Sequence, residues 1–162
     1  MAQEYFTGGC QCGAVRFAVT RLGRASLCHC RMCQKAFAGI GGLLVTARDL
    51  QWTRGQPKHF QSSNKVRRGF CGDCGTPLTF EQERSIDVAI CAFDDPAALP
   101  PTIQLTSELR IPWADALASL PPLPESERAT AAAHYAGIVS YQHPDHDTDA
   151  WPPPRTGDRN GQ

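Results

Sequence analysis

The sequence has no excess of charge of either sign, because its 16 basic and 16 acidic side chains give a formal net charge of zero. A protein that binds nucleic acid would show a basic excess or patch, and adhesion to an anionic membrane needs clustered Lys and Arg. The sequence also lacks any apolar run near the ~20 residues of a membrane-spanning helix. We therefore expect neither nucleic acid nor a membrane as a partner.

The pattern of a secretory signal peptide is missing as well. The first residues, MAQEYFTGGC, contain no basic segment followed by an apolar one. We accordingly expect a cytoplasmic protein, in which thiols stay reduced and clustered cysteines indicate metal binding or catalysis. Eight cysteines, an even number, could also form disulfides. Disulfides are typical of secreted proteins, however, and the sequence shows no secretion signal.

Seven of the eight cysteines fall into three tight clusters, which are Cys10-x-Cys12, Cys28-x-Cys30-x-x-Cys33 and Cys71-x-x-Cys74. Such spacing is typical of zinc ligands, and a closed structural zinc site takes four of them. Four plus three cysteines predict one closed site, which stabilises a fold, and one open site, at which chemistry can take place. The last cluster has the form of a zinc knuckle, and the first cluster is the natural source of its two further ligands.

Short strand-like segments separated by Gly, Pro, Asn and Asp precede the C-terminal third of the chain. In the segment 13–21, Val15, Phe17 and Val19 share one face, as in a half-buried strand. Further strands are expected at 42–47, 58–62, 66–70, 77–82, 86–93 and 102–105. A short helix is expected at 31–37, and a single helical turn at 95–99. This pattern predicts a mainly β fold of short antiparallel strands with few short helices.

The character of the sequence changes after about residue 120. The linker Pro121-Pro122-Leu123-Pro124 is stiff, and the alanine-rich segment that follows could form a helix capped by Ser126. We expect a zinc-binding domain over residues 1–122 and a C-terminal extension over 123–162, with a possible helix at 125–138 and disorder from Gln142 onward. The chain after about Leu123 is expected to be dispensable for folding and metal binding. The run 143–147 (HPDHD) could chelate a metal, but a flexible polar tail is the preferred interpretation.

Three segments carry a resemblance to a known family: 8–17 (GGCQCGAVRF), 28–35 (CHCRMCQK) and 68–78 (RGFCGDCGTPL). In this order they closely resemble the glutathione-dependent formaldehyde-activating enzyme family, also called the centromere-protein-V/formaldehyde-activating domain family. The segment 107–113 (SELRIPW) is similar to the C-terminal part of that family, so the resemblance extends over about residues 5–120.

The resemblance implies a fold, a set of ligands and an activity. The fold is a Mss4-like β-tent of short antiparallel strands with zinc knuckles. Two zinc ions per chain are implied, a structural one held by Cys10, Cys12, Cys71 and Cys74 and a catalytic one held by Cys28, Cys30 and Cys33. The implied activity is that of a carbon–sulfur lyase of the S-hydroxymethyl-thiol synthase type, which adds glutathione or another small thiol to a small aldehyde such as formaldehyde.

Glutathione carries two carboxylates, so a site for it needs basic side chains. Arg31 and Lys35 lie beside the open cluster on the expected helix and are the candidates for binding glutathione. Arg48, Arg67 and Arg68 are further candidates. The alternative for each of them is an ordinary solvated charge at the surface.

A competing interpretation is a zinc-stabilised binding module without catalysis. It would gain if His29, His59 or Cys91 supplied a fourth ligand to the three-cysteine cluster and closed that site. His29 is otherwise a candidate proton shuttle, because the pKa of histidine suits that task, although its side chain should point away from its ligating neighbours.

The eighth cysteine, Cys91, is expected to be a buried and inert thiol on a strand, on the same face as Ala89 and Phe93. Methionine sulfoxide reduction on a related fold would need a reactive cysteine outside the zinc clusters. Cys91 is the one cysteine available, and it lacks a resolving partner. Chromatin binding, known from one branch of the family, is disfavoured by the neutral charge.

Overall fold

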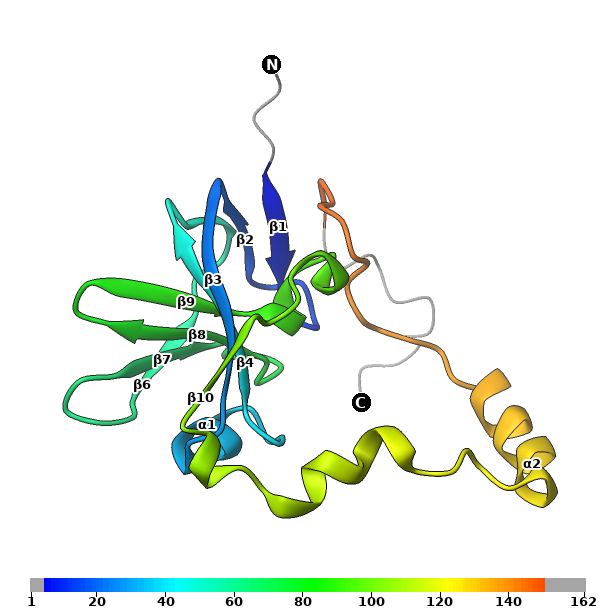
Figure 1. Ribbon diagram of the computed structural model, residues 1–162. Coiled ribbons are helices and arrows are strands. Elements are labelled where there is room, and N and C mark those ends of the chain that lie inside the picture. Colours follow the sequence, from blue (N-terminus) through cyan, green and yellow to red (C-terminus); the bar gives the residue numbers. More distant parts are fainter. Residues whose placement is uncertain (1–4, 151–162) are drawn as a thin grey trace.

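Two β-sheets form the body of the protein in the computed structural model, which describes residues 5–150 (Figure 1). The smaller sheet has the antiparallel order β1-β2-β5, with bounds Phe6–Gly9, Arg16–Val19 and Gln51–Arg54. The larger sheet has the order β10-β3-β4-β9-β8-β7-β6. Its strands are β3 (Arg21–Cys28), β4 (Gly42–Arg48), β6 (Lys58–Gln61), β7 (Arg67–Phe70), β8 (Pro77–Gln82), β9 (Ser85–Ala89) and β10 (Ile103–Leu105).

Helices are few and short. Within residues 5–150 the α-helices are α1 (Arg31–Ala36) and α2 (Glu125–Ala136), and four 3₁₀ helices lie at Ile90–Ala92, Pro96–Ala98, Ser107–Leu109 and Pro112–Ser119. The mainly β class predicted from the sequence is therefore confirmed. No helix among residues 5–150 combines the length and the apolar character that a membrane crossing requires.

The core lies between the two sheets. It is built from the side chains that point inward, because successive side chains along a strand point to opposite faces. Phe17 and Val19 on β2 are fully buried, as are Leu78 on β8 and Val88 on β9. The ring of Phe17 meets the ring of Phe93 edge to face at 5.0 Å between centroids. Each fully buried side chain of this size stabilises the fold by about 1.5–3 kcal/mol relative to exposure.

One strand of the larger sheet runs against the general antiparallel pattern. β10 pairs in parallel with β3, so that Gln104 lies opposite Leu27 and Leu105 opposite Cys28. The pairing brings the segment that follows β10, beginning at Thr106, beside the second cysteine cluster. Residues almost 80 positions apart thereby meet at one end of the sheet.

Several predicted boundaries differ from the structure. The segment 13–21 contains the strand β2, but the separate strand β3 begins at Arg21 and was not predicted. The segment 86–93 is a strand only as far as Ala89, because a 3₁₀ helix turns the chain at Ile90–Ala92. This turn exposes Cys91 to solvent, so the prediction of a buried thiol at this position was wrong.

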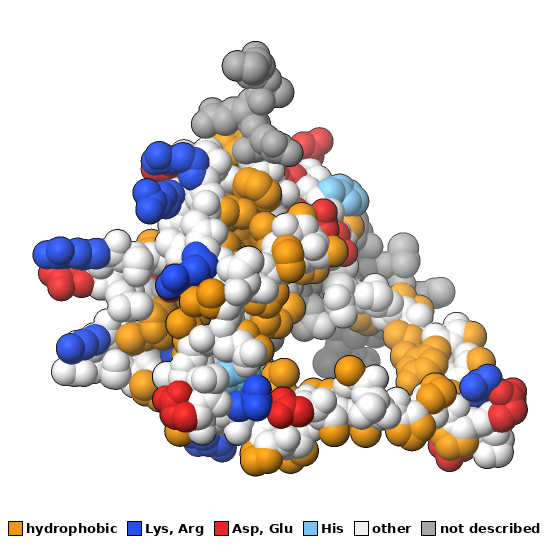
Figure 2. Space-filling view, viewed as in Figure 1, with side chains coloured by type: hydrophobic (Ala, Val, Ile, Leu, Met, Phe, Trp, Pro, Cys, Tyr) orange, Lys and Arg blue, Asp and Glu red, His pale blue; other side chains and the backbone are white. Residues whose placement is uncertain are grey.

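A C-terminal arm, residues 106–141, runs along one edge of the body and then away from it (Figure 1). No residue of α2 is buried, and the helix begins after Pro124 without a side-chain cap, so the capping role expected for Ser126 is not observed. Apolar side chains gather along this arm in Figure 2. The exposed large ones are Leu109, Trp113, Leu117, Leu120, Leu123, Tyr135, Ile138, Val139 and Tyr141.

After the arm the chain returns to the body, where 143–148 lies against the smaller sheet. The backbone N–H of His143 donates to the carbonyl oxygen of Gln11 at 2.8 Å, and Arg54 donates to the carbonyl oxygen of Thr148. Asp147 pairs with Arg16. The prediction of disorder from Gln142 onward was therefore wrong for residues 143–148. The buried Arg16 anchors this segment through Asp147, and composition alone does not indicate such a contact. Residues 151–162 lie outside the described part of the chain.

Candidate metal centres

The first and third cysteine clusters meet in space. The four Sγ atoms of Cys10, Cys12, Cys71 and Cys74 lie within 4.8 Å of one another, with 3.6 Å between Cys10 and Cys12 and 3.8 Å between Cys12 and Cys71. The first pair lies on the connection between β1 and β2, and the second on the connection between β7 and β8. This four-cysteine group therefore joins the two sheets.

Both connections are tight turns of the same design. Gly13 and Gly75 follow the cysteine pairs and have φ angles of 75° and 77°, a left-handed conformation that glycine adopts without steric cost. Their N–H groups donate to the carbonyl oxygens of Cys10 and Cys71, each at 3.0 Å. The turns also aim backbone N–H groups at sulfur, from Val15 to Cys10 at 3.2 Å and from Asp73 to Cys71 at 3.4 Å. Such donors stabilise thiolates.

The electrostatics of the four-cysteine group differ from one thiol to the next. Burial raises the pKa of Cys10 and that of Cys12. At Cys74 burial also raises the pKa, but hydrogen bonds from the hydroxyl and the backbone of Thr76 outweigh it and lower the pKa to about 6. Without a metal, the group is therefore partly protonated at neutral pH. A metal ion that binds here must displace these protons.

The second cluster forms a separate group of three. The Sγ atoms of Cys28, Cys30 and Cys33 lie within 4.8 Å of one another. Cys28 is the last residue of β3. Cys30 caps the N-terminus of α1, because its Sγ accepts a hydrogen bond from the backbone N–H of Cys33 at 3.4 Å. Cys33 belongs to α1, and its side chain is fully buried. A strand end followed at once by a helix start thus brings the three sulfurs to one point.

No His, Cys, Asp or Glu within residues 5–150 joins this three-cysteine group as a fourth ligand. The three residues considered for that position lie elsewhere. Nε2 of His59 contacts Oε1 of Glu81 at 3.0 Å, and Nε2 of His29 contacts Oε1 of Gln104 at 2.8 Å. Cys91 is exposed on its 3₁₀ helix and borders a different hollow, together with Arg16 and His143.

The three thiols have different proton affinities. Burial raises the pKa of Cys33 to about 12, although a hydrogen bond from Arg68 lowers it in part. Burial also raises the pKa of Cys30, but hydrogen bonds from the backbone N–H and the thiol of Cys33 outweigh it, so that its net pKa is lowered. Cys30 is therefore the more readily deprotonated of the two.

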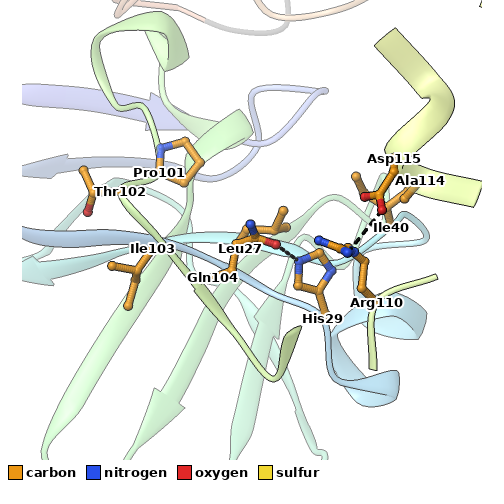
Figure 3. Close-up of a pocket in the computed structure, with 10 residues that line it drawn as sticks. All are labelled: Leu27, His29, Ile40, Pro101, Thr102, Ile103, Gln104, Arg110, Ala114 and Asp115. Atoms are coloured by element: carbon orange, nitrogen blue, oxygen red, sulfur yellow. Dashed lines mark hydrogen bonds and ion pairs between the residues drawn. The ribbon is translucent and has the colours of Figure 1, made fainter. Parts of the chain in front are cut away.

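His29 points away from its cysteine neighbours, as the sequence suggested, and into a cavity of about 500 Å³ (Figure 3). The cavity is bordered by Leu27 and Gln104 from the paired strands and by the ion pair of Arg110 with Asp115 from the arm. His29 is 1% exposed, and its Nδ1 atom has no hydrogen-bond partner. The cavity wall contains none of the three clustered cysteines, so His29 is not placed to move a proton at their sulfur atoms.

Arg31 and Lys35 are exposed on α1, where they border a shallow hollow of about 420 Å³ with Trp113. Both basic side chains are therefore accessible to an anion from solvent. Of the further candidates, Arg48 is exposed, and Arg67 pairs with Glu81 at 2.5 Å. Arg68 is buried and faces the three-cysteine group, so the interpretation as a solvated surface charge was wrong for this residue.

Sequence reasoning missed Thr106. Its Oγ1 lies 3.7 Å from Sγ of Cys28, and its φ of 50° is a strained conformation for a β-branched residue. No motif marks this position, because its approach depends on the parallel pairing of β10 with β3. Thr106 thus places a hydroxyl group beside Cys28 of the three-cysteine group.

The donor chemistry of both groups fits zinc. Thiolates are soft ligands that favour zinc over hard ions such as Mg²⁺ and Ca²⁺, and four of them match the tetrahedral shell of a structural zinc site. Three thiolates match the ligand count of a catalytic site with one open position. The two groups could therefore hold two metal ions, one with four protein ligands and one with three.

A sequence profile of the family described as glutathione-dependent formaldehyde-activating enzyme matches residues 5–108, more than half of the chain. Among solved structures, the crystal structure of a Rhodobacter sphaeroides protein, a structural genomics target, is similar with a TM-score of 0.50 and 25% sequence identity. That match covers 60% of this chain and 98% of the other. No curated protein matches the sequence.

Proposed function

The chain belongs to the glutathione-dependent formaldehyde-activating enzyme family, and from this premise we propose that it is a zinc-dependent carbon–sulfur lyase. Its reaction adds glutathione, or another small thiol, to a small aldehyde such as formaldehyde. The observation that carries the proposal is the three-cysteine group, which has no fourth protein ligand within residues 5–150. A site that is open in this way can accept a substrate.

The addition is balanced without a further reactant. The thiol loses its proton, its sulfur forms a bond to the carbonyl carbon, the carbonyl π bond breaks, and the oxygen receives a proton. The product is an S-hydroxymethyl thiol. A zinc ion at the open site would supply the Lewis acidity that favours a thiolate over a thiol or polarises the aldehyde oxygen.

The residues of the chain have distinct roles in this proposal. Cys28, Cys30 and Cys33 hold the catalytic ion, and the four-cysteine group holds a structural one. Arg31 and Lys35 bind the carboxylates of glutathione from the exposed side of α1. Arg31 is one residue from Cys30 in the sequence, and Lys35 is two residues from Cys33. We also retain, as part of the proposal, a catalytic domain over residues 1–122 with an extension over 123–162.

The test follows the exchange of formaldehyde with glutathione by NMR, with the purified protein, with its Cys30→Ser variant and without protein. We expect the wild type to accelerate the exchange rate and Cys30→Ser not to. The rate is the criterion, since the uncatalysed addition already forms product and product formation alone would not reveal catalysis. Acceleration with other small thiols but not with glutathione would keep the family chemistry with a different substrate. If no thiol perturbs the metal site, the non-catalytic zinc-stabilised binding module replaces the enzyme.

A further inference from the structure

Arg68 is a buried cation without a carboxylate. Its side chain is 6% exposed, and none of the ion pairs within residues 5–150 includes it. What it contacts instead is sulfur, because Nη2 donates to Sγ of Cys33 at 3.5 Å. Removing a guanidinium from water is costly unless an opposite charge compensates it. The three-cysteine group, which Arg68 contacts directly through Cys33, can supply that charge.

The side chain of Arg68 is held firmly in this position. Its guanidinium carbon lies 4.9 Å from the ring centre of Phe80 and 5.7 Å from that of Phe37, within the range of cation–π contacts. Nε donates to Oγ of Ser62 at 3.0 Å. These three contacts fix the plane of the guanidinium and aim one edge of it at Cys33.

One donor of this fixed group remains unused. Nη1 of Arg68 is buried and has no hydrogen-bond partner. A buried N–H of a cation without a partner is rare in folded proteins, so it indicates a group that the protein alone does not supply. The protein thus holds a positive charge, with spare donor capacity, beside three sulfur atoms.

The neighbour of Arg68 shows that this arrangement is specific. Arg67 precedes it on β7, and because side chains alternate along a strand it lies on the other face. Arg67 is 54% exposed and pairs with Glu81, with Nη2 at 2.5 Å from Oε2. Two adjacent arginines therefore have different partners, a carboxylate for the exposed one and a thiol for the buried one.

We propose that Arg68 is the charge partner of the three-cysteine centre. Three thiolates around a divalent ion leave one negative charge in excess, and Arg68 neutralises it inside the protein. By this neutralisation Arg68 strengthens metal binding at the open site, and it lets a thiol substrate enter as an anion. The inference rests on the proposed function, since it assumes a metal at Cys28, Cys30 and Cys33. Arg68 is a positioning residue, because it acts through Cys33.

The experiment measures zinc affinity by competition with a chromophoric chelator. It compares the full-length wild type with Arg68→Gln, Arg68→Lys and the matched control Arg67→Gln. In Arg68→Gln we expect one of the two zinc ions to bind about 10- to 100-fold more weakly, as is typical when a partner of a metal ligand is removed, and the other to bind as in the wild type. Arg67→Gln should bind both ions as the wild type does, and Arg68→Lys should recover most of the loss.

Cobalt substitution identifies the affected site. The thiolate-to-cobalt absorption that is missing in Cys30→Ser belongs to the three-cysteine group, and the same component should be the one weakened in Arg68→Gln. The proposal is overturned if Arg68→Gln retains both zinc affinities, if it weakens the four-cysteine group instead, or if Arg67→Gln has the same effect. Should Arg68→Gln not fold, a folded Arg68→Lys decides the matter, because a loss of 10-fold or more with the charge retained would contradict the proposal.

These measurements need neither thiol nor aldehyde, so they separate the two proposals. A wild type that binds zinc in an Arg68-dependent way but does not accelerate formaldehyde exchange would refute the reaction and leave the role of Arg68 intact. If the wild type accelerates formaldehyde exchange but Arg68→Gln keeps both zinc affinities, the reaction would stand and the proposed role of Arg68 would be refuted.

Discussion

Arg16 and Asp147 lie 131 positions apart in the sequence, yet Nη2 of Arg16 is 2.6 Å from Oδ1 of Asp147. Arg16 is 3% exposed and also forms two hydrogen bonds to Asp94, at 2.8 Å and 2.6 Å. The end of the described chain is thus attached to the smaller sheet through a buried arginine. The attachment lies close to the loop of Cys10 and Cys12, since His143 donates to Gln11.

The first prediction concerns this attachment. Asp147→Asn should lower the free energy of unfolding by about 0.5–1 kcal/mol, because Asp147 is half exposed and such pairs are weak. Asp145→Asn is the matched control, since Asp145 is an exposed tail aspartate outside the ion pairs of residues 5–150. Urea unfolding of both variants measures the difference. Equal stability of the two variants would show that the tail is as dispensable as its composition suggests.

The second prediction is a dependence of stability on pH through Asp94. Burial raises the pKa of Asp94, but hydrogen bonds from Arg16 and Thr7 outweigh it, so that the net pKa is held below its usual value. A carboxyl with a depressed pKa in the folded state stabilises the protein above its unfolded pKa of about 4, and this contribution disappears as the pH falls through the folded value. Stability should therefore decrease below about pH 4.

Asp94→Asn isolates this effect. At pH 7 we expect the variant to be less stable by about 2–3 kcal/mol, because it loses charged hydrogen bonds to a buried arginine. The gap between the wild type and the variant should narrow as the pH falls below about 4. Acid also removes metal from both proteins, so the difference between them, measured by thermal unfolding, is the relevant quantity. A gap that is constant with pH would contradict the assignment.

The third prediction separates the two cysteine groups. Structural zinc can contribute an apparent ~10–16 kcal/mol of binding free energy that is inseparable from folding. Cys71→Ser should therefore unfold the domain, whereas Cys30→Ser should give a folded protein with one zinc ion fewer. Cys91→Ser, at an exposed thiol outside both groups, is the control that should keep both ions. Elemental analysis with circular dichroism checks this, and equal collapse of the first two variants would refute the division.

The fourth prediction concerns the thiol substrate. Replacement of both Arg31 and Lys35 by Ala should raise KM for glutathione roughly 3- to 10-fold, since exposed charges contribute little individually. The same variant should treat 2-mercaptoethanol, which has no carboxylate, as the wild type does. Lys65→Ala, at an exposed residue near the end of β6, serves as the control. A parallel loss for both thiols would place the defect in the metal site instead.

The fifth prediction concerns α2, which buries none of its residues. Ala132→Pro should destroy the helix, at a local cost of about 3 kcal/mol, because proline removes a backbone donor and clashes with the preceding turn. The main thermal transition of the domain should stay within about 1 °C of the wild type. Loss of helical signal in circular dichroism with an unchanged transition is the expected result, and a lowered transition would mean that α2 packs on the body.

The sequence was most informative where chemistry restricts spacing. The intervals within Cys10-x-Cys12 and Cys71-x-x-Cys74 match those of metal ligands, and the structure brings these four sulfurs within 4.8 Å of one another. Cys28, Cys30 and Cys33 could be recognised as one cluster for the same reason. Strand β8 at Pro77–Gln82 was predicted with its exact bounds, because turn residues limit it on both sides.

Other features depend on contacts that spacing does not encode. The strand β3 contains Arg21, Gly23 and Arg24, so its first half lacks the alternation by which strands are recognised. Its identity is set by pairing with β4 and β10. The burial of Arg68 likewise arises from aromatic rings on α1's C-terminal side and on β8, and no local pattern distinguishes it from Arg67.

The four-cysteine group has a further consequence for the order in which the chain folds. Its two halves are separated by 59 residues between Cys12 and Cys71. A cross-link over a loop of this length removes about 4 kcal/mol of conformational entropy from the unfolded chain, if the estimate for disulfides is applied. A metal ion captured early would shorten the conformational search that brings the first and third quarters of the strand-forming sequence, residues 6–105, together. Refolding should accordingly become faster as the concentration of free zinc rises.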